Sequence, residues 1–257
     1  MGRSGSKITE RVLHRMARRH WARVADQADN INISNLRTYR KDARELRKHI
    51  NALIAVADGR LALPRLGSNL TQSPAHSDWV WRPEIWAVPL EIPGVVDTQN
   101  NAKIGTQAQL FHDGTHGDLM LRQMRNNSRS DLAPFSLKMD VFDTGGSYVS
   151  VVVDLPESAL DGLTKNHIIR ADIWAQIERP IGTSFRLNIQ HGPNSEQILN
   201  YAQFDQDHAV VEFDLAYAKI HEKRVEKIWI DLIFEKPWMT QIVLRDVTFS
   251  RQIRAEL

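Results

Sequence analysis

Along most of the chain after about residue 102, apolar residues stand at every second position. Two neighbouring stretches show this pattern most clearly: Phe135, Leu137, Met139 and Val141, and then Val149, Val151, Val153 and Leu155. A period of two places successive side chains on opposite faces of a strand, so each stretch predicts a strand with one buried face. No helical stretches alternate with these strands, which argues against a doubly wound nucleotide-binding fold. The pattern predicts an antiparallel β-sandwich of jelly-roll type.

About nine strands are expected in total. Beyond the two stretches above, they are placed at 167–178, 184–191, 209–215, 225–235 and 241–250, with shorter ones before residue 135. The turn at 143–147 is expected to join its two flanking strands as a hairpin, and the Gly-rich segment 111–118 is expected to do the same for Ala108 and Leu110 facing Leu119 and Leu121. The segment 79–93 holds three Trp and three Pro, which predicts an irregular segment that packs its indoles onto the β-domain.

The first 57 residues carry a helical period instead. Apolar residues recur there at spacings of three and four, which makes a heptad seam over three heptads. Its members are Leu36, Tyr39, Ala43, Leu46, Ile50, Leu53 and Ala57. Ser34 is expected to cap the start of this helix, and Gly59 to end it. An earlier apolar stripe predicts a preceding helix, so we expect helices over roughly 7–29 and 35–57.

Charge divides the chain at the same place. Residues 1–60 hold 14 Lys and Arg against 6 Asp and Glu, whereas the remainder holds 19 and 25. We therefore expect a basic helical arm (1–57), a linker (58–78) and a β-sandwich domain (79–257). The arm has three interpretations: its stripes pack on each other or on the β-domain, its seam self-associates as a coiled coil and gives an oligomer, or its basic face contacts an anionic partner such as a membrane surface. The acidic remainder and the lack of a nucleic-acid-binding signature argue against nucleic acid.

Composition limits the chemistry that the chain can perform. There is no Cys, which excludes disulfides, thiolate metal sites and Cys nucleophiles. No run of about 18 apolar residues exists, so no transmembrane segment is expected. The first residues lack the apolar stretch of a signal peptide, and we expect a cytoplasmic protein. No phosphate-binding Gly-rich loop or nucleophile elbow is present, and no cofactor is expected.

Two tryptophans fall on the polar side of the strand alternation. Trp174 shares its register with Arg170, Asp172 and Gln176, and Trp229 with Lys227 and Asp231. The polar face of the strand between them carries Arg186, Asn188 and Gln190, and His191 ends that strand either as a further ligand residue or as a turn residue. Indoles that cover the apolar face of a sugar ring, beside polar groups that bind its hydroxyls, are what carbohydrate binding needs. The alternative is that the helical arm or residues 79–93 cover both indoles.

Candidates for catalysis and for a metal are weak. Glu178 and Asp231 lie on polar faces and could form a glycosidase pair, but their separation cannot be read from the sequence. A second cluster, His112, Asp113, His116 and Asp118, has ligand types suited to a divalent metal. The same stretch is a Gly-rich turn in which Asp-Gly is expected for backbone reasons alone, and we favour that interpretation. We expect neither a metal site nor, on balance, an enzyme.

Part of the β-domain resembles a known class. The segments Lys227–Glu235 and Ile242–Phe249 resemble the closing strand pair of jelly-roll carbohydrate-binding modules, as does Arg170–Glu178. The whole chain is similar to an uncharacterised bacterial family, in phrases such as Arg82-Pro-Glu-Ile-Trp86 and Phe213-Asp-Leu-Ala-Tyr217. The first resemblance implies a carbohydrate ligand, whereas the second implies no activity.

We therefore predict a non-catalytic binding protein, in which a β-sandwich recognises a carbohydrate or glycan-related ligand and a helical arm mediates assembly. The expected ligand residues are Trp174, Trp229, Arg186, Asn188, Gln190, Asp231 and His191. Two alternatives stay open: a structural scaffold subunit that binds protein through the same surfaces, and a sugar-active enzyme on the same fold.

Overall fold

The computed structural model describes residues 4–61, 74–96, 99–115, 118–128, 130–143 and 145–254. The chain divides into two compact units, Met1–Leu53 and Ile54–Leu257, and each unit is described by itself. The first contains helices, and the second contains all the described strands. In the described part of the chain, no helix is long and apolar enough to cross a lipid bilayer.

The helical unit consists of α1 (Ser4–Asp26), the 3₁₀ turn η1 (Ala28–Asn30) and α2 (Ile33–Leu61), which runs into the second unit. The two predicted helices are confirmed, but both predicted ends of the second are wrong. Asn32 caps α2, because its Oδ1 accepts a hydrogen bond from the backbone N–H of Asn35 at 2.9 Å. Ser34 only donates its hydroxyl to that same oxygen, at 2.8 Å. Gly59 does not end the helix, which continues to Leu61.

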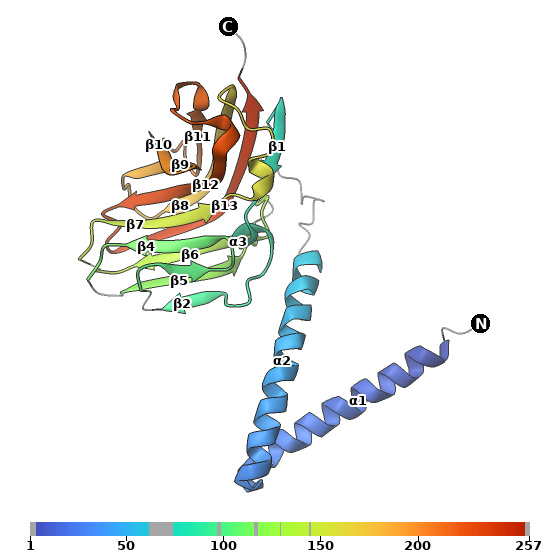
Figure 1. Cartoon of the computed structure of the whole chain (residues 1–257). Coiled ribbons are helices and arrows are strands. Elements are labelled where there is room, and N and C mark those ends of the chain that lie inside the picture. Colours follow the sequence, from blue (N-terminus) through green and yellow to red (C-terminus); the bar gives the residue numbers. More distant parts are fainter. Residues whose placement is uncertain are drawn as a thin grey trace. The chain divides into compact units, whose positions relative to one another are not determined.

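The β-unit is an antiparallel jelly-roll sandwich of two sheets (Figure 1). Sheet A runs in the spatial order β11 (His208–Asp214), β8 (His167–Ile177), β13 (Thr240–Ile253), β6 (Phe135–Val141), β5 (Leu119–Arg125) and β2 (Gly94–Val96), with β1 (Ser77–Trp81) paired to β13. Sheet B runs in the order β10 (Asn194–Tyr201), β9 (Thr183–His191), β12 (Val225–Glu235), β7 (Tyr148–Asp154), β4 (Ala108–His112) and β3 (Ala102–Ile104). From β6 to β9 each successive strand lies in the other sheet.

The core lies between the two sheets and is built by the residues that the alternation predicted. Val151 on β7, Leu187 on β9 and Ile230 on β12 have no exposed surface, and Leu137 and Ile173 from sheet A are equally buried. Burying an aliphatic side chain of this size contributes about 1.5–3 kcal/mol. Most outward residues of the same strands are polar, and a slip by one residue would exchange the two faces, so burial of the apolar face fixes the register of each strand.

Both predicted hairpins are wrong. β6 lies in sheet A and β7 in sheet B, so the turn at 143–147 passes between the sheets instead of joining neighbouring strands. The same holds for β4 in sheet B and β5 in sheet A. Two strands that pair within a sheet and two that face each other across the core have the same alternation, so the sequence pattern alone does not separate these cases.

Of the described strands after residue 135, β10 alone was not predicted. Residues Asn194–Tyr201 form β10, which pairs only with β9 at the edge of sheet B. None of its side chains is buried. An edge strand without a buried face carries little apolar alternation, and this explains why it was missed.

The tryptophan-rich segment is more regular than predicted. Residues Ser77–Trp81 form β1 on β13, and Glu84–Ala87 form the short helix α3. All three indoles pack against the core, as expected. Trp86 is wholly buried, and its Nε1–H donates to the carbonyl oxygen of Leu244 at 2.9 Å. Trp81 stacks on Phe249 with ring centroids 6.1 Å apart.

Candidate ligand-binding groove on the outer face of sheet B

A groove of about 830 Å³ lies on the face of sheet B that points away from the core. Its walls come from β4, β7, β12, β9 and β10, so it crosses five of the six strands. This volume is within the range of about 300–1,000 Å³ that ligand sites usually occupy. We call this hollow the sheet-B groove.

Strand register sets the side chains of the groove in rows. On β12, Trp229 lies opposite Asp154 of β7 on one side and opposite Asn188 of β9 on the other. The next row brings Asp231 of β12 beside Arg186 of β9. All these residues are the polar-face members of their strands, so the alternation that builds the core also builds the groove.

Charges in the groove are largely paired. Arg186 donates to Oδ2 of Asp231 through Nε at 2.7 Å, and its Nη2 lies 2.6 Å from the same oxygen. Asn188 donates to that oxygen as well, through Nδ2 at 3.2 Å. Asp231 is only 2% exposed, so the guanidinium and amide groups are what stabilise its charge in the sheet. A second pair joins Lys227 Nζ to Asp154 Oδ1 at 2.9 Å.

The charged residues that line the groove balance each other. Three are cationic and three are anionic: Arg186, Lys227 and Lys236, against Asp154, Asp231 and Glu235. A site without net charge gives no electrostatic preference for an anion or a cation. It therefore suits a neutral polar ligand better than a charged one.

The remaining groups of the groove are amides and aromatic rings. The side-chain amides of Gln109, Gln190 and Gln197 have no hydrogen-bond partner within the described part of the chain. Aromatic surface is supplied by Trp229, with Phe111 and Tyr148 on the far side. An amide can both donate to and accept from a hydroxyl group, and an aromatic face covers C–H groups.

A buried hydroxyl also faces the groove. Ser150 on β7 lies between Phe111 of β4 and Ile233 of β12 in the same row. Its Oγ is buried and has no hydrogen-bond partner among the described residues. A buried hydroxyl left unpaired costs about 1–3 kcal/mol, so a ligand group that reaches it would recover part of that free energy.

Asp113 fixes one rim of the groove. Its Oδ1 accepts hydrogen bonds from the backbone N–H groups of Ser147 and Tyr148 at 2.6 and 3.1 Å, and its Oδ2 accepts from the Ser147 hydroxyl at 2.5 Å. Partial burial acts to raise the pKa of Asp113, but these hydrogen bonds outweigh it and hold that pKa below its ordinary value. Asp113 thus acts as a capping residue for the turn that positions Tyr148.

The structure brings together five of the seven predicted ligand residues. Trp229, Arg186, Asn188, Gln190 and Asp231 all line the sheet-B groove. Within the β-unit, Trp229 is half-buried and Trp174 is 37% exposed, so residues 79–93 do not close over either indole.

Trp174 and His191 lie elsewhere. Trp174 is on β8 in sheet A, so the expectation that it shares a face with Trp229 is wrong. It stacks instead on His208 of β11, with ring centroids 4.5 Å apart. His191 is the last residue of β9 and is buried in the register of Ile189, on the core side, next to the turn that joins β9 to β10.

The weak catalytic and metal candidates are not assembled. Glu178 follows β8 of sheet A and accepts a hydrogen bond from the backbone of Gln241 at 3.0 Å, whereas Asp231 is in sheet B. His112 is buried, on the opposite face of β4 from the groove, and Asp113 is engaged with the 147–148 backbone. Asp118 is exposed, and His116 lies outside the described residues. The described ranges hold no group of three His, Asp or Glu arranged for a metal ion.

Several groove residues were not predicted, namely Gln109, Phe111, Tyr148, Asp154 and Gln197. The sequence alternation already placed Tyr148 and Asp154 on the outer face of their strand, because Val149 and Val153 beside them point inward. What the sequence lacked was the strand order that sets β4, β7 and β10 beside β9 and β12.

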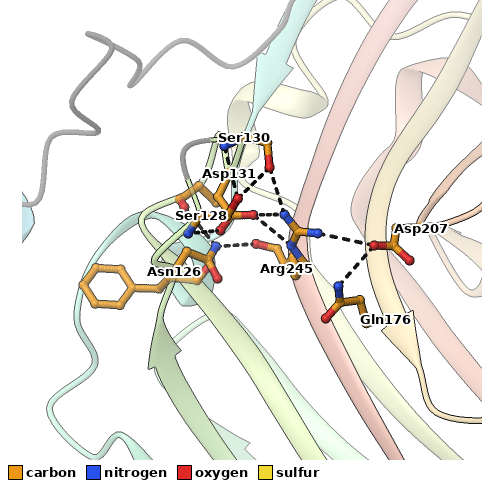
Figure 2. A network of polar contacts seen from close by, with 9 residues as sticks. Asn126, Ser128, Ser130, Asp131, Gln176, Asp207 and Arg245 are labelled. Carbon is orange, nitrogen blue, oxygen red and sulfur yellow. Dashed lines mark hydrogen bonds and ion pairs between the residues drawn. The ribbon is translucent and has the colours of Figure 1, made fainter.

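The outer face of sheet A has a different character. Arg245, at the bulge of β13, pairs with Asp131 and lies 3.4 Å from Asp207, which also accepts a hydrogen bond from Gln176 (Figure 2). Asn126 donates to three carbonyl oxygens beside it, including that of Arg245 at 2.9 Å. These contacts fasten the β5–β6 connection to β13 and use the polar groups that a ligand would need.

A smaller hollow of about 310 Å³ lies beside Trp174 on the same face. Arg82 and Asp246, which line it, form a bidentate buried ion pair, with nitrogen–oxygen distances of 2.9 and 2.8 Å. Arg170 and Asp172 are joined in the same way, at 2.7 and 2.9 Å. The charges of this hollow are thus already satisfied within the protein.

The fold is a jelly-roll β-sandwich that carries a groove of polar and aromatic side chains on the outer face of one sheet. The chain belongs to the family of unknown function DUF6478, whose model matches residues 1–257. A search of curated proteins gives no match.

Solved structures of similar fold are remote in sequence. The enzymatically active domain of tailspike protein 4 from bacteriophage CBA120 has a TM-score of 0.41 at 10% identity over 63% of this chain, which spans only 22% of that protein. A family 11 carbohydrate-binding module from Clostridium thermocellum has a TM-score of 0.35 at 11% identity, over 61% of this chain and 96% of the module. The CBM22-1 xylan-binding domain from Paenibacillus barcinonensis Xyn10C has a TM-score of 0.33 at 10% identity, over 63% and 94%. At these values, nothing about a ligand of this chain follows from the likeness.

Proposed function

We propose that the chain binds a neutral carbohydrate in the sheet-B groove. The observation that carries this proposal is the composition of the groove. Aromatic surface lies beside side-chain amides that have no hydrogen-bond partner among the described residues, and cationic and anionic groups are equal in number. A pyranose offers apolar C–H faces and several neutral hydroxyls, which match these two kinds of surface. A charged ligand would leave one set of the paired groups without its partner.

Trp229 is the aromatic platform in this proposal. Its indole is half-buried, and the ammonium group of Lys227 lies 5.5 Å from the ring centroid. Lys227 is itself fixed by Asp154. These two contacts hold the ring in place before a ligand arrives, which reduces the entropy lost on binding.

The proposed activity is binding without turnover. Glycoside hydrolysis needs two carboxyl groups on either side of the scissile bond. Of the three carboxylates in the groove, Asp231 is engaged by Arg186 and Asn188, and Asp154 by Lys227. Only Glu235 has no ion-pair partner among the described residues, and Glu178 lies in the other sheet, so no second free carboxyl group stands opposite Glu235.

The test is a glycan array probed with the full-length protein, followed by calorimetry on any glycan retained. Trp229→Ala should abolish binding, whereas Trp174→Ala is the matched control, because it removes an equally large exposed ring from sheet A. Gln197→Ala serves as a second groove variant, since its side chain is exposed and its loss should leave the fold intact. Equal loss of binding in Trp174→Ala, or no retained glycan for the folded wild-type protein, would contradict the proposal.

A further inference from the structure

The heptad seam of α2 is open in the helical unit. Leu46, Ile50 and Leu53 are 39, 45 and 68% exposed, and Leu36 at the start of the seam is 38% exposed. The side chain of Ala57, the last seam member, lies outside the described residues. An apolar stripe of this length left in water gives up the burial that normally holds a helix in place.

α1 does not close the seam. The two helices meet at η1 and diverge from there (Figure 1). Near the junction, Tyr39 is half-buried, with its ring centroid 6.5 Å from that of Trp21 and 6.2 Å from that of His20. Within the helical unit, α1 therefore contacts the seam at Tyr39 without burying it, and Leu46, Ile50 and Leu53 stay exposed.

The spacing of the seam identifies the kind of partner. Spacings of three and four repeated over three heptads place two residues of every heptad at the core positions of a two-stranded coiled coil. Leu36, Ala43 and Ile50 occupy the first core position, and Tyr39, Leu46 and Leu53 the second. A lipid surface needs only a broad apolar face with the helical period of 3.6 and does not call for this repeat.

The charged residues that flank the seam identify the partner further. In two parallel helices in register, Asp42 of one chain lies beside the second copy's Arg47, five residues further along, and the symmetry of the pair produces this contact twice. Both side chains are exposed, and neither takes part in an ion pair within the part of the chain that the structure describes. The preceding flanking positions hold Asn35 and Arg40, which bring no like charges together.

An antiparallel arrangement is disfavoured by the same residues. Arg40 and Arg47 each directly follow a seam residue of the second core position, Tyr39 or Leu46. In an antiparallel pair these equivalent positions of the two helices face each other, so Arg40 of one chain would meet Arg47 of the other. The other basic residues, including Arg37, Lys41 and Arg44, point away from the seam in either arrangement. Like charges in contact destabilise a helix pair, and the parallel arrangement avoids them.

We propose that α2 pairs with a second copy of the chain as a parallel, in-register coiled coil through Leu36–Leu53, with Asp42 and Arg47 forming ion pairs between the two chains. The protein is then a dimer held by its helical unit.

The absence of Cys from the chain permits a clean test of register. Leu46→Cys places the same seam residue of two parallel chains opposite each other, within reach of a disulfide, which needs Cα atoms less than about 7 Å apart. Arg44→Cys is the control on the outer face of the same helix. Under mild oxidation, covalent dimer should form in Leu46→Cys and not in Arg44→Cys. Equal cross-linking in both variants would mean random collision and would overturn the proposal.

The ion pair is tested by exchanging its charges in the full-length protein. Asp42→Arg and Arg47→Asp should each weaken dimer formation, measured by sedimentation equilibrium, because each sets like charges against each other. The double variant Asp42→Arg/Arg47→Asp should restore the wild-type dissociation constant. A wild-type protein that is monomeric at every concentration overturns the proposal, and if that monomer co-sediments with phosphatidylserine vesicles, the arm is a membrane-binding element instead. A double variant that is weaker than both single variants overturns the parallel arrangement.

Discussion

Arg186 and Asp231 face each other across β9 and β12, and the guanidinium group meets one carboxylate oxygen through both Nε and Nη2. The two partners differ in exposure, because the side chain of Asp231 is 4% exposed and that of Arg186 is 40% exposed. Arg186 therefore lies between the buried carboxylate of Asp231 and the solvent, and it compensates the charge of that carboxylate.

Removal of the Arg186 guanidinium group should destabilise the sandwich. Arg186→Ala leaves the carboxylate of Asp231 buried with only Asn188 as a partner, and we expect a loss of about 2–3 kcal/mol in the free energy of unfolding, less than for a fully buried pair. Urea denaturation measures it. Arg122→Ala is the control, since its contact with Asp140 is long, at 3.7 Å, and exposed, and it should change stability by less than about 1 kcal/mol. Equal effects in the two variants would contradict this assignment.

Asp113 should make stability depend on pH in the acid range. Its hydrogen bonds from Ser147 and Tyr148 exist only in the folded chain, so its folded pKa lies below the ordinary value of 3.8. The stability that it contributes is present in full above that value and is lost as the pH falls through the lowered folded pKa.

The measurement is the melting temperature of Asp113→Asn and wild type from neutral pH down to pH about 2. The variant should melt lower at neutral pH, and the difference should shrink as the wild-type carboxylate is protonated. Asp118→Asn, an exposed carboxylate in the same connection, should track the wild type. A constant difference at every pH would rule out this role for Asp113.

Asn32, and not Ser34, should stabilise the start of α2. Asn32→Ala removes the acceptor for the backbone of Asn35 and should destabilise the first turn of α2 by about 1 kcal/mol, whereas Ser34→Ala should have little effect. Hydrogen exchange at residues 33–37 reports this directly. Faster exchange in Ser34→Ala than in Asn32→Ala would reverse the assignment.

If a glycan binds the sheet-B groove, a single amide should tune its affinity. Gln197 is exposed on the edge strand β10, and its amide has no partner in the described part of the chain. Loss of one neutral hydrogen bond in Gln197→Ala should weaken binding about 2- to 12-fold, with an unchanged melting temperature. An unchanged affinity, measured by calorimetry, would exclude Gln197 from the binding surface.

Dimer formation through α2 should raise the apparent affinity for an immobilised glycan polymer but leave the affinity for a soluble sugar unchanged. Each chain carries one groove, so a dimer carries two, and simultaneous binding raises apparent affinity for an immobilised polymer. Arg47→Asp should reduce retention on such a surface about tenfold or more, while calorimetry with a soluble oligosaccharide stays unchanged. A parallel loss in both measurements would place Arg47 in the groove interaction itself.

Much of the architecture was determined by the sequence alone. The alternation at Val149–Leu155 and Phe185–Ile189 assigned the buried face of each strand, because a half-buried strand leaves a period of two whatever its neighbours are. The heptads of α2 and the division between a basic arm and an acidic β-domain were equally local. For the same reason Trp229, Asp231 and Arg186 could be recognised as polar-face residues.

Strand order was decided only by the tertiary structure. Whether β6 pairs with β7 or faces it across the core depends on contacts between residues far apart in the chain, and both arrangements satisfy the same alternation. That order separated Trp174 from Trp229 by placing β8 and β12 in different sheets, and it brought Gln109, Tyr148 and Gln197 to the groove. The local periodicity determines to which face of its strand a side chain points. The packing of the two sheets determines which side chains become neighbours.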